Sequence, residues 1–318
     1  MARARRPMTG PGGLVAVHAH PDDETLSTGA LLAAWAAAGL PVTVVTATRG
    51  ERGEVIPPAL AHLEGDGPAL AAHRTGELAA ALAALGVGEH AFLDALPQRP
   101  RSSGSGHRDA RTLRYEDSGM VWVGTARAGA GDDVPDGAFV AVPLEEAAGR
   151  LAGLLRARRP ALVVTYDPEG GYGHPDHVRT HEVTMRAVEL ASGDGWEPAV
   201  WWRRTGRAAL AAGYRALASI AHDDLVLPDH DGPQPAVAVP DEAVDVHVDV
   251  PAVRDRVLAA MHAHATQIQA VRAVEGDAAL VGCFALSDRR LQPLLPREGY
   301  VQVSGPRLDV PAKERRLP

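Results

Sequence analysis

Short apolar runs alternate along the first half of the chain with longer segments in which apolar residues recur every three or four positions. The short runs have the composition of buried strands and lie at residues 14–17, 42–46, 91–93 and 161–165. The longer segments have the spacing of amphipathic helices and occupy residues 23–38, 70–86 and 144–158. This alternation predicts an α/β fold, with a Rossmann-like, doubly wound and mostly parallel sheet covered by helices on both faces.

Changes in composition divide the chain into four parts. We expect a flexible arm at residues 1–13, a Rossmann-like core at 14–192, a smaller C-terminal β/α portion packed on it at 193–291, and a loosely attached tail at 292–318. Residues 94–141 interrupt the alternation within the core and predict an insert.

Overall composition narrows the class of protein. The 318 residues are 46% hydrophobic and 23% charged, which is typical of globular proteins, and the net charge of −8 gives no general attraction for nucleic acid. The longest apolar run, residues 30–40, is too short to span a membrane. Cys283 is the only cysteine, which excludes an internal disulfide and favours a reducing compartment. We therefore expect a soluble cytoplasmic protein, whose oligomeric state the sequence leaves open.

Two clusters of imidazole and carboxylate side chains follow predicted strands. His-Pro-Asp-Asp-Glu at residues 20–24 comes after the first strand, and Gly-His-Pro-Asp-His at residues 173–177 comes shortly after the fourth. The carboxyl ends of parallel strands meet at one edge of a sheet, where ligands bind in open α/β folds. Imidazole and carboxylate are ordinary zinc ligands, and three such ligands with one open position define a catalytic site. The two clusters together predict a catalytic metal site.

Each cluster also has a structural explanation. Either aspartate of the first cluster could cap the helix that follows it, and the histidines of the second cluster could lie on the surface. Two His-Pro-Asp clusters at strand ends are harder to explain in this way. His18 could share a face with the first cluster, but a core position explains it equally well, and packing is the better explanation for His264.

Together, the two clusters resemble the zinc-dependent de-N-acetylases related to GlcNAc-phosphatidylinositol deacetylase. The similarity runs over residues 14–267 and includes His-Arg-Thr-Gly-Glu-Leu at 73–78 and Asp-Ser-Gly-Met at 117–120. It does not cover residues 99–113. Within the family, the chain is most similar to members that act on GlcNAc-inositol in mycothiol biosynthesis. The resemblance implies one Zn²⁺ per subunit, with Fe²⁺ as the alternative.

The resemblance also implies roles for particular residues. The metal ligands would be His20, Asp23 and His177. The catalytic residues would be Asp22 as general base, His174 and Tyr172 at the oxyanion, and Asp176, which would orient His174 or another imidazole. The substrate contacts would be Glu54, Arg74 and Asp117. A surface position is the alternative for Arg74, and a solvated loop is the alternative for Glu54.

The implied activity is metal-dependent hydrolysis of the N-acetyl group of GlcNAc-inositol to acetate and glucosaminyl-inositol, so a small sugar–inositol is the expected partner. One alternative is a mycothiol S-conjugate amidase, which cleaves a larger amide beside the same sugar–inositol. We expect residues 115–122 to form the wall of the acyl pocket that separates these two activities. A non-catalytic, metal-dependent carbohydrate-binding protein is the alternative from another class. Such a protein would not need Asp22 or His174, so both residues favour an enzyme.

Overall fold

The structure is a computed structural model that describes residues 12–98, 114–122, 128–129, 131, 134–193, 195–220 and 224–311. Most of the expected N-terminal arm, residues 99–113 of the insert and the last residues of the expected tail lie outside the described residues.

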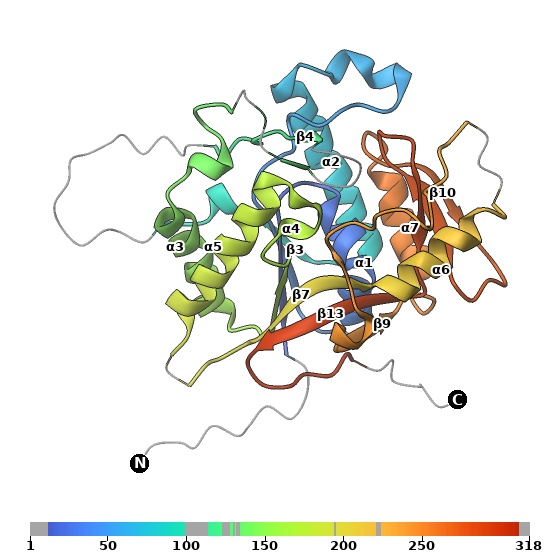
Figure 1. Ribbon diagram of the computed structural model, residues 1–318. Coiled ribbons are helices and arrows are strands. Elements are labelled where there is room, and N and C mark those ends of the chain that lie inside the picture. Colours follow the sequence, from blue (N-terminus) through green and yellow to red (C-terminus); the bar gives the residue numbers. More distant parts are fainter. Residues whose placement is uncertain are drawn as a thin grey trace.

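An eight-stranded sheet forms the centre of the molecule (Figure 1), and its strands follow the order β3-β2-β1-β6-β7-β13-β9, with β8 paired to β7. The strands are β1 (Leu14–His18), β2 (Val42–Thr46), β3 (Glu89–Phe92), β6 (Leu162–Thr165), β7 (Ala199–Gly206), β8 (Ala238–Val239), β9 (Val246–Asp249) and β13 (Arg297–Ser304). Every pair among β3, β2, β1, β6, β7 and β8 is parallel, whereas β13 is antiparallel to both β7 and β9. The predicted mostly parallel α/β sheet is confirmed.

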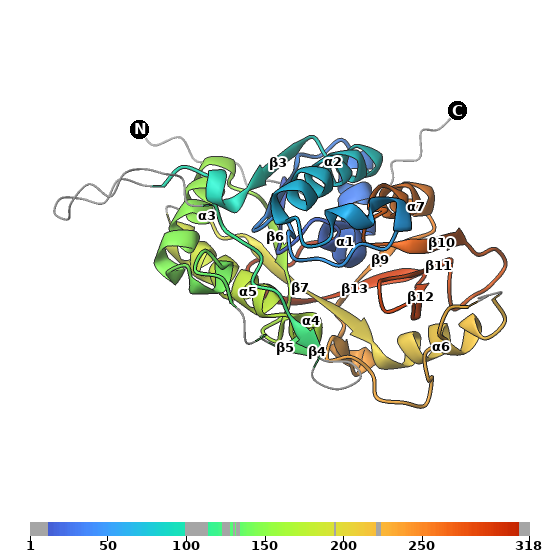
Figure 2. The same ribbon diagram turned by 90° about the horizontal axis from the view of Figure 1, so that it is seen from above.

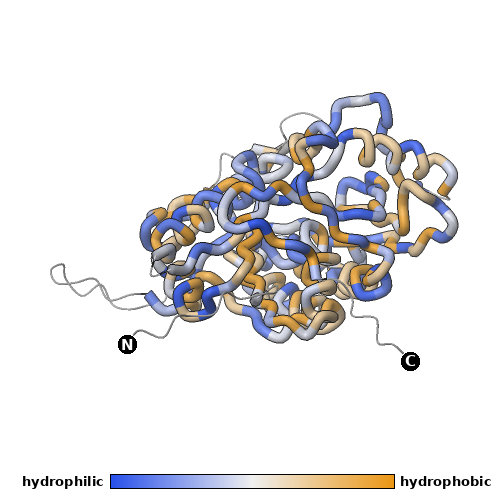
Figure 3. Tube along the Cα trace, turned by 90° about the horizontal axis from the view of Figure 1, so that it is seen from below, coloured by the Kyte–Doolittle hydropathy of each residue, from blue (hydrophilic) through white to orange (hydrophobic). Residues whose placement is uncertain are grey.

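Helices cover both faces of this sheet, as Figure 2 shows from above. On one face lie α1 (Asp23–Ala37), α2 (Gly67–Leu85) and α7 (Arg254–Ala263), and on the other lie α3 (Leu144–Arg158) and α5 (Pro175–Ala191). Neighbouring strand residues point to opposite faces, so Ala16 packs with the first group and Val17 with the second. Strands β1, β2 and β6 are accordingly rich in apolar residues, and Figure 3 shows hydrophobic and hydrophilic positions interspersed along the trace.

A smaller antiparallel sheet lies beside the main one, with strands β10 (Gln269–Ala273), β11 (Gly282–Ala285) and β12 (Leu291–Leu294). Helix α6 (Arg207–Leu217) packs against it. The remaining short elements are β4 (Val121–Trp122), β5 (Ala128–Gly129), α4 (Gly170–Gly173) and the 3-10 helices η1 (Pro58–Leu63), η2 (Leu93–Ala95), η3 (Phe139–Ala141) and η4 (Asp241–Ala243).

The C-terminal residues differ from the expected loose tail at 292–318. Strand β13 lies inside the main sheet between β7 and β9, and its Tyr300 is fully buried. The prolines that favoured a tail are compatible with this arrangement, because Pro293 lies in β12, an edge strand of the smaller sheet, and an edge strand tolerates a proline.

Helix α1 is interrupted at Thr28, whose backbone angles are not helical (φ −139°, ψ 15°). Beyond the interruption, the backbone N–H groups of Ala30 and Leu31 donate to the carboxylate of Glu298 in β13, at 2.6 and 3.0 Å. Tyr300 donates its hydroxyl to the same carboxylate at 2.7 Å. The last strand of the sheet thus holds the helix that begins at the first His/Asp cluster.

Candidate metal centre

The fold brings the two His/Asp clusters together. Strands β1 and β6 are parallel neighbours, so the segments that follow their carboxyl ends lie side by side. From β1 the chain continues to β2 on one side of this strand pair, and from β6 it continues to β7 on the other side. Ligands bind at such a reversal of strand order in open α/β folds. The rings of His20, His174 and His177 have centroids between 4.6 and 5.4 Å apart. All three histidines are buried.

Asp23 lies between two of these imidazoles. Its Oδ2 atom is 3.3 Å from Nδ1 of His20 and 3.3 Å from Nε2 of His177. Although burial opposes it, the imidazoles hold the pKa of Asp23 well below its usual value. Nε2 of His177 is buried and has no hydrogen-bond partner among the described residues, which is a costly state for a ring nitrogen. A metal ion between these three side chains would give this nitrogen a partner, so the residues fit the implied metal.

Among the described residues, two overlapping sets of side chains offer ligand atoms within 4.8 Å of one another. One consists of His20, His174 and His177, and the other of His20, Asp117 and Asp176. The set predicted from the sequence shares two histidines with the first set and adds Asp23. The choice of ligands within this cluster therefore stays a prediction.

His20 is held by a carboxylate on its far side. Its Nε2 lies 3.1 Å from Oδ2 of Asp176, and Asp176 also accepts hydrogen bonds from the backbone N–H (2.9 Å) and hydroxyl (2.5 Å) of Ser118. Metal-binding histidines usually donate their second ring N–H to such a carboxylate. The arrangement leaves Nδ1 of His20 free to face Asp23. The Asp176 carboxylate thus contacts His20, whereas the sequence left open which imidazole it would orient.

His174 is placed as a neutral hydrogen-bond donor. Its Nδ1 accepts the backbone N–H of Asp176 at 3.1 Å, so the proton of the neutral ring resides on Nε2. Burial and the neighbouring imidazoles of His20 and His177 lower its pKa to about 2, which keeps the ring neutral. The ring of Tyr172 packs 6.1 Å from that of His174, and burial raises the pKa of its hydroxyl well above the usual value. Both side chains can donate a hydrogen bond to an oxyanion.

Asp22 occupies the N-cap position of α1 but makes no side-chain capping bond, so the capping explanation does not hold for it. Its backbone has a positive φ of 111°, a conformation that costs a residue other than glycine about 1–3 kcal/mol. Its carboxylate lies 3.4 Å from Nη2 of Arg74. Burial raises the pKa of Asp22 to about 6 although Arg74 opposes the shift, and a carboxyl tuned in this way suits a general base.

The three predicted substrate contacts occupy different environments. Arg74 is 3% exposed, so the surface alternative is wrong, and its guanidinium donates to the backbone carbonyls of Gly50 and Pro21. Asp117 is buried at the centre, 3.7 Å from Nε2 of His20. Glu54 is exposed. Of the three, the structure places only Asp117 directly beside the imidazole cluster.

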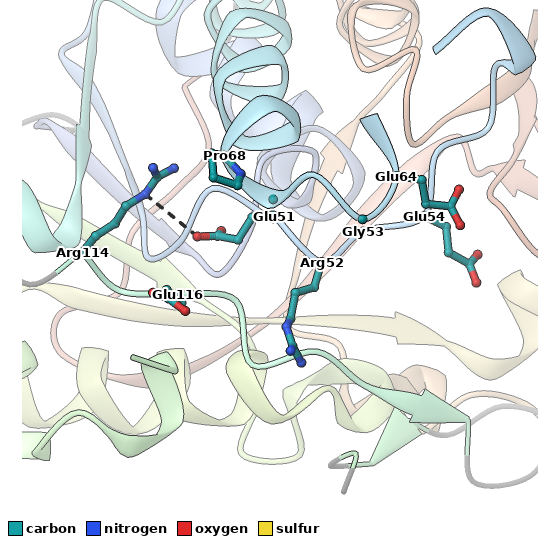
Figure 4. A pocket seen from close by; sticks show the side chains of 10 residues that line it. Glu51, Arg52, Gly53, Glu54, Glu64, Pro68, Arg114 and Glu116 are labelled. Atoms are coloured by element: carbon teal, nitrogen blue, oxygen red, sulfur yellow. Dashed lines mark ion pairs between the residues drawn. The ribbon is translucent and has the colours of Figure 1, made fainter. Parts of the chain in front are cut away.

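Within the described part of the chain, Glu54 lines a cavity of about 460 Å³ whose walls include no residue of the two His/Asp clusters (Figure 4). Its walls carry charged side chains from three segments, namely Glu51, Arg52, Glu54, Glu64, Arg114 and Glu116. Arg114 and Glu51 face each other across it at 3.9 Å. The backbone N–H of Arg52 donates to Asp117 at 3.4 Å, which connects the cavity wall to the buried cluster.

Sequence reasoning missed several residues of the centre. The hydroxyl of Tyr166 accepts the backbone N–H of Ala19 at 3.0 Å, and its ring stacks on His177 with centroids 4.2 Å apart. Tyr166 directly follows β6, and this position at a strand end was the only available signal. Glu24 and His264 also meet here, at 2.7 Å. Sequence reasoning expected a packed position for His264, and its side chain is fully buried, but it gave no sign of the contact with Glu24.

Comparison with known proteins identifies the family. The family model described as PIG-L, GlcNAc-PI de-N-acetylase, matches residues 15–188, a stretch that contains every predicted site residue. The chain is 47% identical to a 1D-myo-inositol 2-acetamido-2-deoxy-alpha-D-glucopyranoside deacetylase of Kineococcus radiotolerans, over 93% of this chain and 78% of the relative. It is 42% identical to a protein of the same name from Streptomyces griseus subsp. griseus, over 92% and 83% of the two chains.

The similarity of this chain to solved structures is weaker. An N,N'-diacetylchitobiose deacetylase from Pyrococcus horikoshii is 18% identical, with a TM-score of 0.48 over 82% of this chain and 72% of that chain.

The chain belongs to the GlcNAc-PI de-N-acetylase family, as the two sequence clusters predicted. It is accordingly a metal-dependent hydrolase that acts on amide bonds. Within the described residues, no helix has both the length and the apolar character needed to cross a membrane.

Proposed function

We propose that the protein removes the acetyl group from GlcNAc-inositol, giving acetate and glucosaminyl-inositol in the cytoplasmic pathway to mycothiol. The chemistry rests on one observation, the position of Asp23 at 3.3 Å from ring nitrogens of both His20 and His177. The substrate is inferred from the relatives at 42–47% identity, whose names specify it.

We further propose that Nδ1 of His20, Oδ2 of Asp23 and Nε2 of His177 hold one zinc ion. Imidazole and carboxylate also suit ferrous iron, which is the alternative. When bound, such a metal polarises the acetamide carbonyl and makes water acidic enough to act as a nucleophile near neutral pH.

The protein's own side chains would then move the protons. Asp22 accepts a proton from the attacking water and returns it to the nitrogen as the carbon–nitrogen bond breaks, so the amine leaves neutral. The second proton of the water stays on the acyl group, which leaves as acetic acid and ionises to acetate near neutral pH. Nε2–H of His174 donates to the oxygen that becomes negative in the tetrahedral intermediate, and the hydroxyl of Tyr172 assists. Arg74 holds Asp22 in place through the contact at 3.4 Å.

The sugar–inositol would extend from the centre toward the charged cavity. Carboxylates accept hydrogen bonds from hydroxyl groups, and Asp117 lies beside His20 while Glu54 lines the cavity. The terminal nitrogens of Arg74 already contact two backbone carbonyls and Asp22, so we propose that it supports the sugar site from behind. The segment 115–122 borders the centre through Asp117 and Ser118, and we propose it as the wall of the acyl pocket.

Three compounds compared on one metal-loaded preparation test this function. We expect GlcNAc-inositol to exceed a mycothiol S-conjugate in kcat/KM by at least about tenfold, since a modest mismatch in a pocket has that effect. Free GlcNAc should be poorer than GlcNAc-inositol, because the binding energy of the inositol is lost.

A conjugate that is cleaved faster than GlcNAc-inositol would make the protein a mycothiol S-conjugate amidase. Metal and sugar binding without turnover of any of the three compounds would instead indicate a carbohydrate-binding protein.

A further inference from the structure

Glu24, the last residue of the first His/Asp cluster, forms a fully buried pair with His264. Nε2 of His264 lies 2.7 Å from Oε1 of Glu24, and both side chains are 0% exposed. Glu24 belongs to the first turn of α1, whereas His264 follows the end of α7. A buried carboxylate requires partners of this kind, so the pair fixes the position of the Glu24 side chain.

The second oxygen of this carboxylate contacts the backbone of Asp22. Oε2 of Glu24 accepts the N–H of Asp22 at 3.0 Å, while the hydroxyl of Thr25 donates to Oε1 at 2.6 Å. Asp22 has a φ of 111°, which residues with a side chain adopt only where their surroundings impose it. Arg74 contacts the other side of the same residue, at its carboxylate and at the carbonyl of Pro21.

The segment that carries His264 is anchored independently of this pair. Thr266 donates its N–H and its hydroxyl to Glu77 at 2.8 and 2.6 Å, and Gln267 donates to the backbone carbonyl of Glu54 at 2.8 Å. Replacement of the His264 side chain therefore leaves the backbone of this segment held. Nδ1 of His264 has no hydrogen-bond partner among the described residues, so Nε2 carries its contact with Glu24.

We propose that His264 is a positioning residue for the reaction: it holds Glu24, and Glu24 keeps Asp22 in the strained conformation that directs its carboxylate to the site. This inference rests on the proposed role of Asp22 as the base. His264 comes from the C-terminal portion and contacts neither the predicted metal ligands nor the charged cavity, so its role in the reaction would be indirect.

The test compares His264→Ala with His264→Gln, whose side-chain amide can still donate to Glu24. We expect the alanine variant of the metal-loaded enzyme to lose roughly 10- to 100-fold in kcat for GlcNAc-inositol, the scale of one hydrogen bond to a charged group. KM and metal stoichiometry should stay within about twofold, because no ligand or sugar contact changes. The glutamine variant should recover most of kcat.

A double-mutant cycle with Asp22→Ala separates positioning from general destabilisation. In the Asp22→Ala background, His264→Ala should cause no further loss of kcat, since the group that it positions is gone. If the alanine variant does not fold, His264→Asn, whose amide is too short to reach Glu24, replaces it in the cycle.

An equal loss of kcat with and without Asp22, or equal losses in the alanine and glutamine variants, overturns the inference. So does a lower Tm with an unchanged kcat. If Asp22→Ala itself keeps a normal kcat, the proposed base is wrong, whereas a normal kcat in His264→Ala alone refutes only the positioning role.

Discussion

Asp22 and Asp23 are adjacent in sequence, yet their carboxyl groups have opposite environments. The imidazoles of His177 and His20 hold the pKa of Asp23 low, whereas burial raises the pKa of Asp22 to about 6. Neighbouring carboxyl groups whose pKa values are pushed apart usually serve different roles. The positive φ of Asp22 makes this possible, because it turns the Asp22 side chain away from its neighbour and toward Arg74.

Substitutions of the proposed base and of the proposed metal ligands should therefore separate the chemical step from metal binding. We expect Asp22→Ala to keep its metal but lose roughly 10²–10⁴-fold in kcat, as for a missing general base. His20→Ala and His177→Ala should lose the metal, because each removes one proposed ligand. Metal analysis of the purified variants, together with steady-state kinetics, measures both effects.

His174→Ala is the matched control, since it lies in the same cluster but is not a proposed ligand. It should keep its metal and lose about 10²–10³-fold in kcat, the scale of an oxyanion donor. If His177→Ala still binds one tight equivalent, or His174→Ala loses the metal, the ligand assignment must change.

The residues of the two clusters were predictable because each cluster is short and follows the end of a strand. Their partners were not predictable in the same way. The contacts of His20 with Asp176 and of Asp176 with Ser118 join residues that are distant in sequence, and they depend on the order of strands in the sheet. The burial of Arg74 likewise arises from the loop that folds over it.

Among the elements, α1 shows a feature that its sequence conceals. The sequence predicts one regular helix over residues 23–38, but the structure interrupts it at Thr28. The N–H groups released there are satisfied by Glu298, which comes from a segment that composition assigned to a loose tail. An interruption of this kind depends on a distant acceptor and cannot be read from the helix alone.

Glu298→Ala should destabilise the fold, because it leaves the N–H groups of Ala30 and Leu31 buried without an acceptor. We expect the free energy of unfolding to fall by on the order of 3 kcal/mol, measured by urea denaturation. Glu298→Gln keeps one acceptor oxygen and should lose less. Equal stability of the alanine variant and the unmodified protein would contradict the bracing role of Glu298.

The unmodified protein and the Glu298→Gln variant should also differ in how their stability depends on pH. Burial raises the pKa of Glu298 above its ordinary value of 4.5, although Arg203 and the hydrogen bonds oppose the shift. The folded state then binds this proton more tightly than the unfolded state, so the contribution of Glu298 to stability declines as the pH rises through the folded-state pKa. The glutamine variant should therefore gain in stability relative to the unmodified protein as the pH is raised from about 4.5. Denaturation curves at several pH values test the sign.

At the scale of the whole molecule, the proposed metal centre joins the end of β1 to the start of α5. A metal that binds the folded chain alone should stabilise it, by about 2.7 kcal/mol when its free concentration is a hundredfold above Kd. We expect a chelator to lower Tm and added zinc to restore it. His177→Ala should show neither response, and a full response in that variant would place the metal elsewhere.

The overall architecture was predictable as far as β6, because strand and helix alternate locally along that part of the chain. Strand β7 (Ala199–Gly206) belongs to the same sheet, although the sequence predicts a core that ends at residue 192. The place of β13 was not predictable, since it enters the sheet antiparallel between β7 and β9, and no local pattern specifies that order. The function followed from the part that was predictable, because both His/Asp clusters lie before β7.

The position of β13 also has a consequence for how the protein is made. A ribosome adds about 5–20 residues per second, so the segment with His20 and Asp23 emerges tens of seconds before the strand that carries Glu298. Once His177 has also emerged, the nascent chain has its proposed metal ligands but still lacks the carboxylate that braces α1. A message truncated just before residue 297 would therefore encode every proposed catalytic group in a chain that leaves the N–H groups of Ala30 and Leu31 without the Glu298 carboxylate.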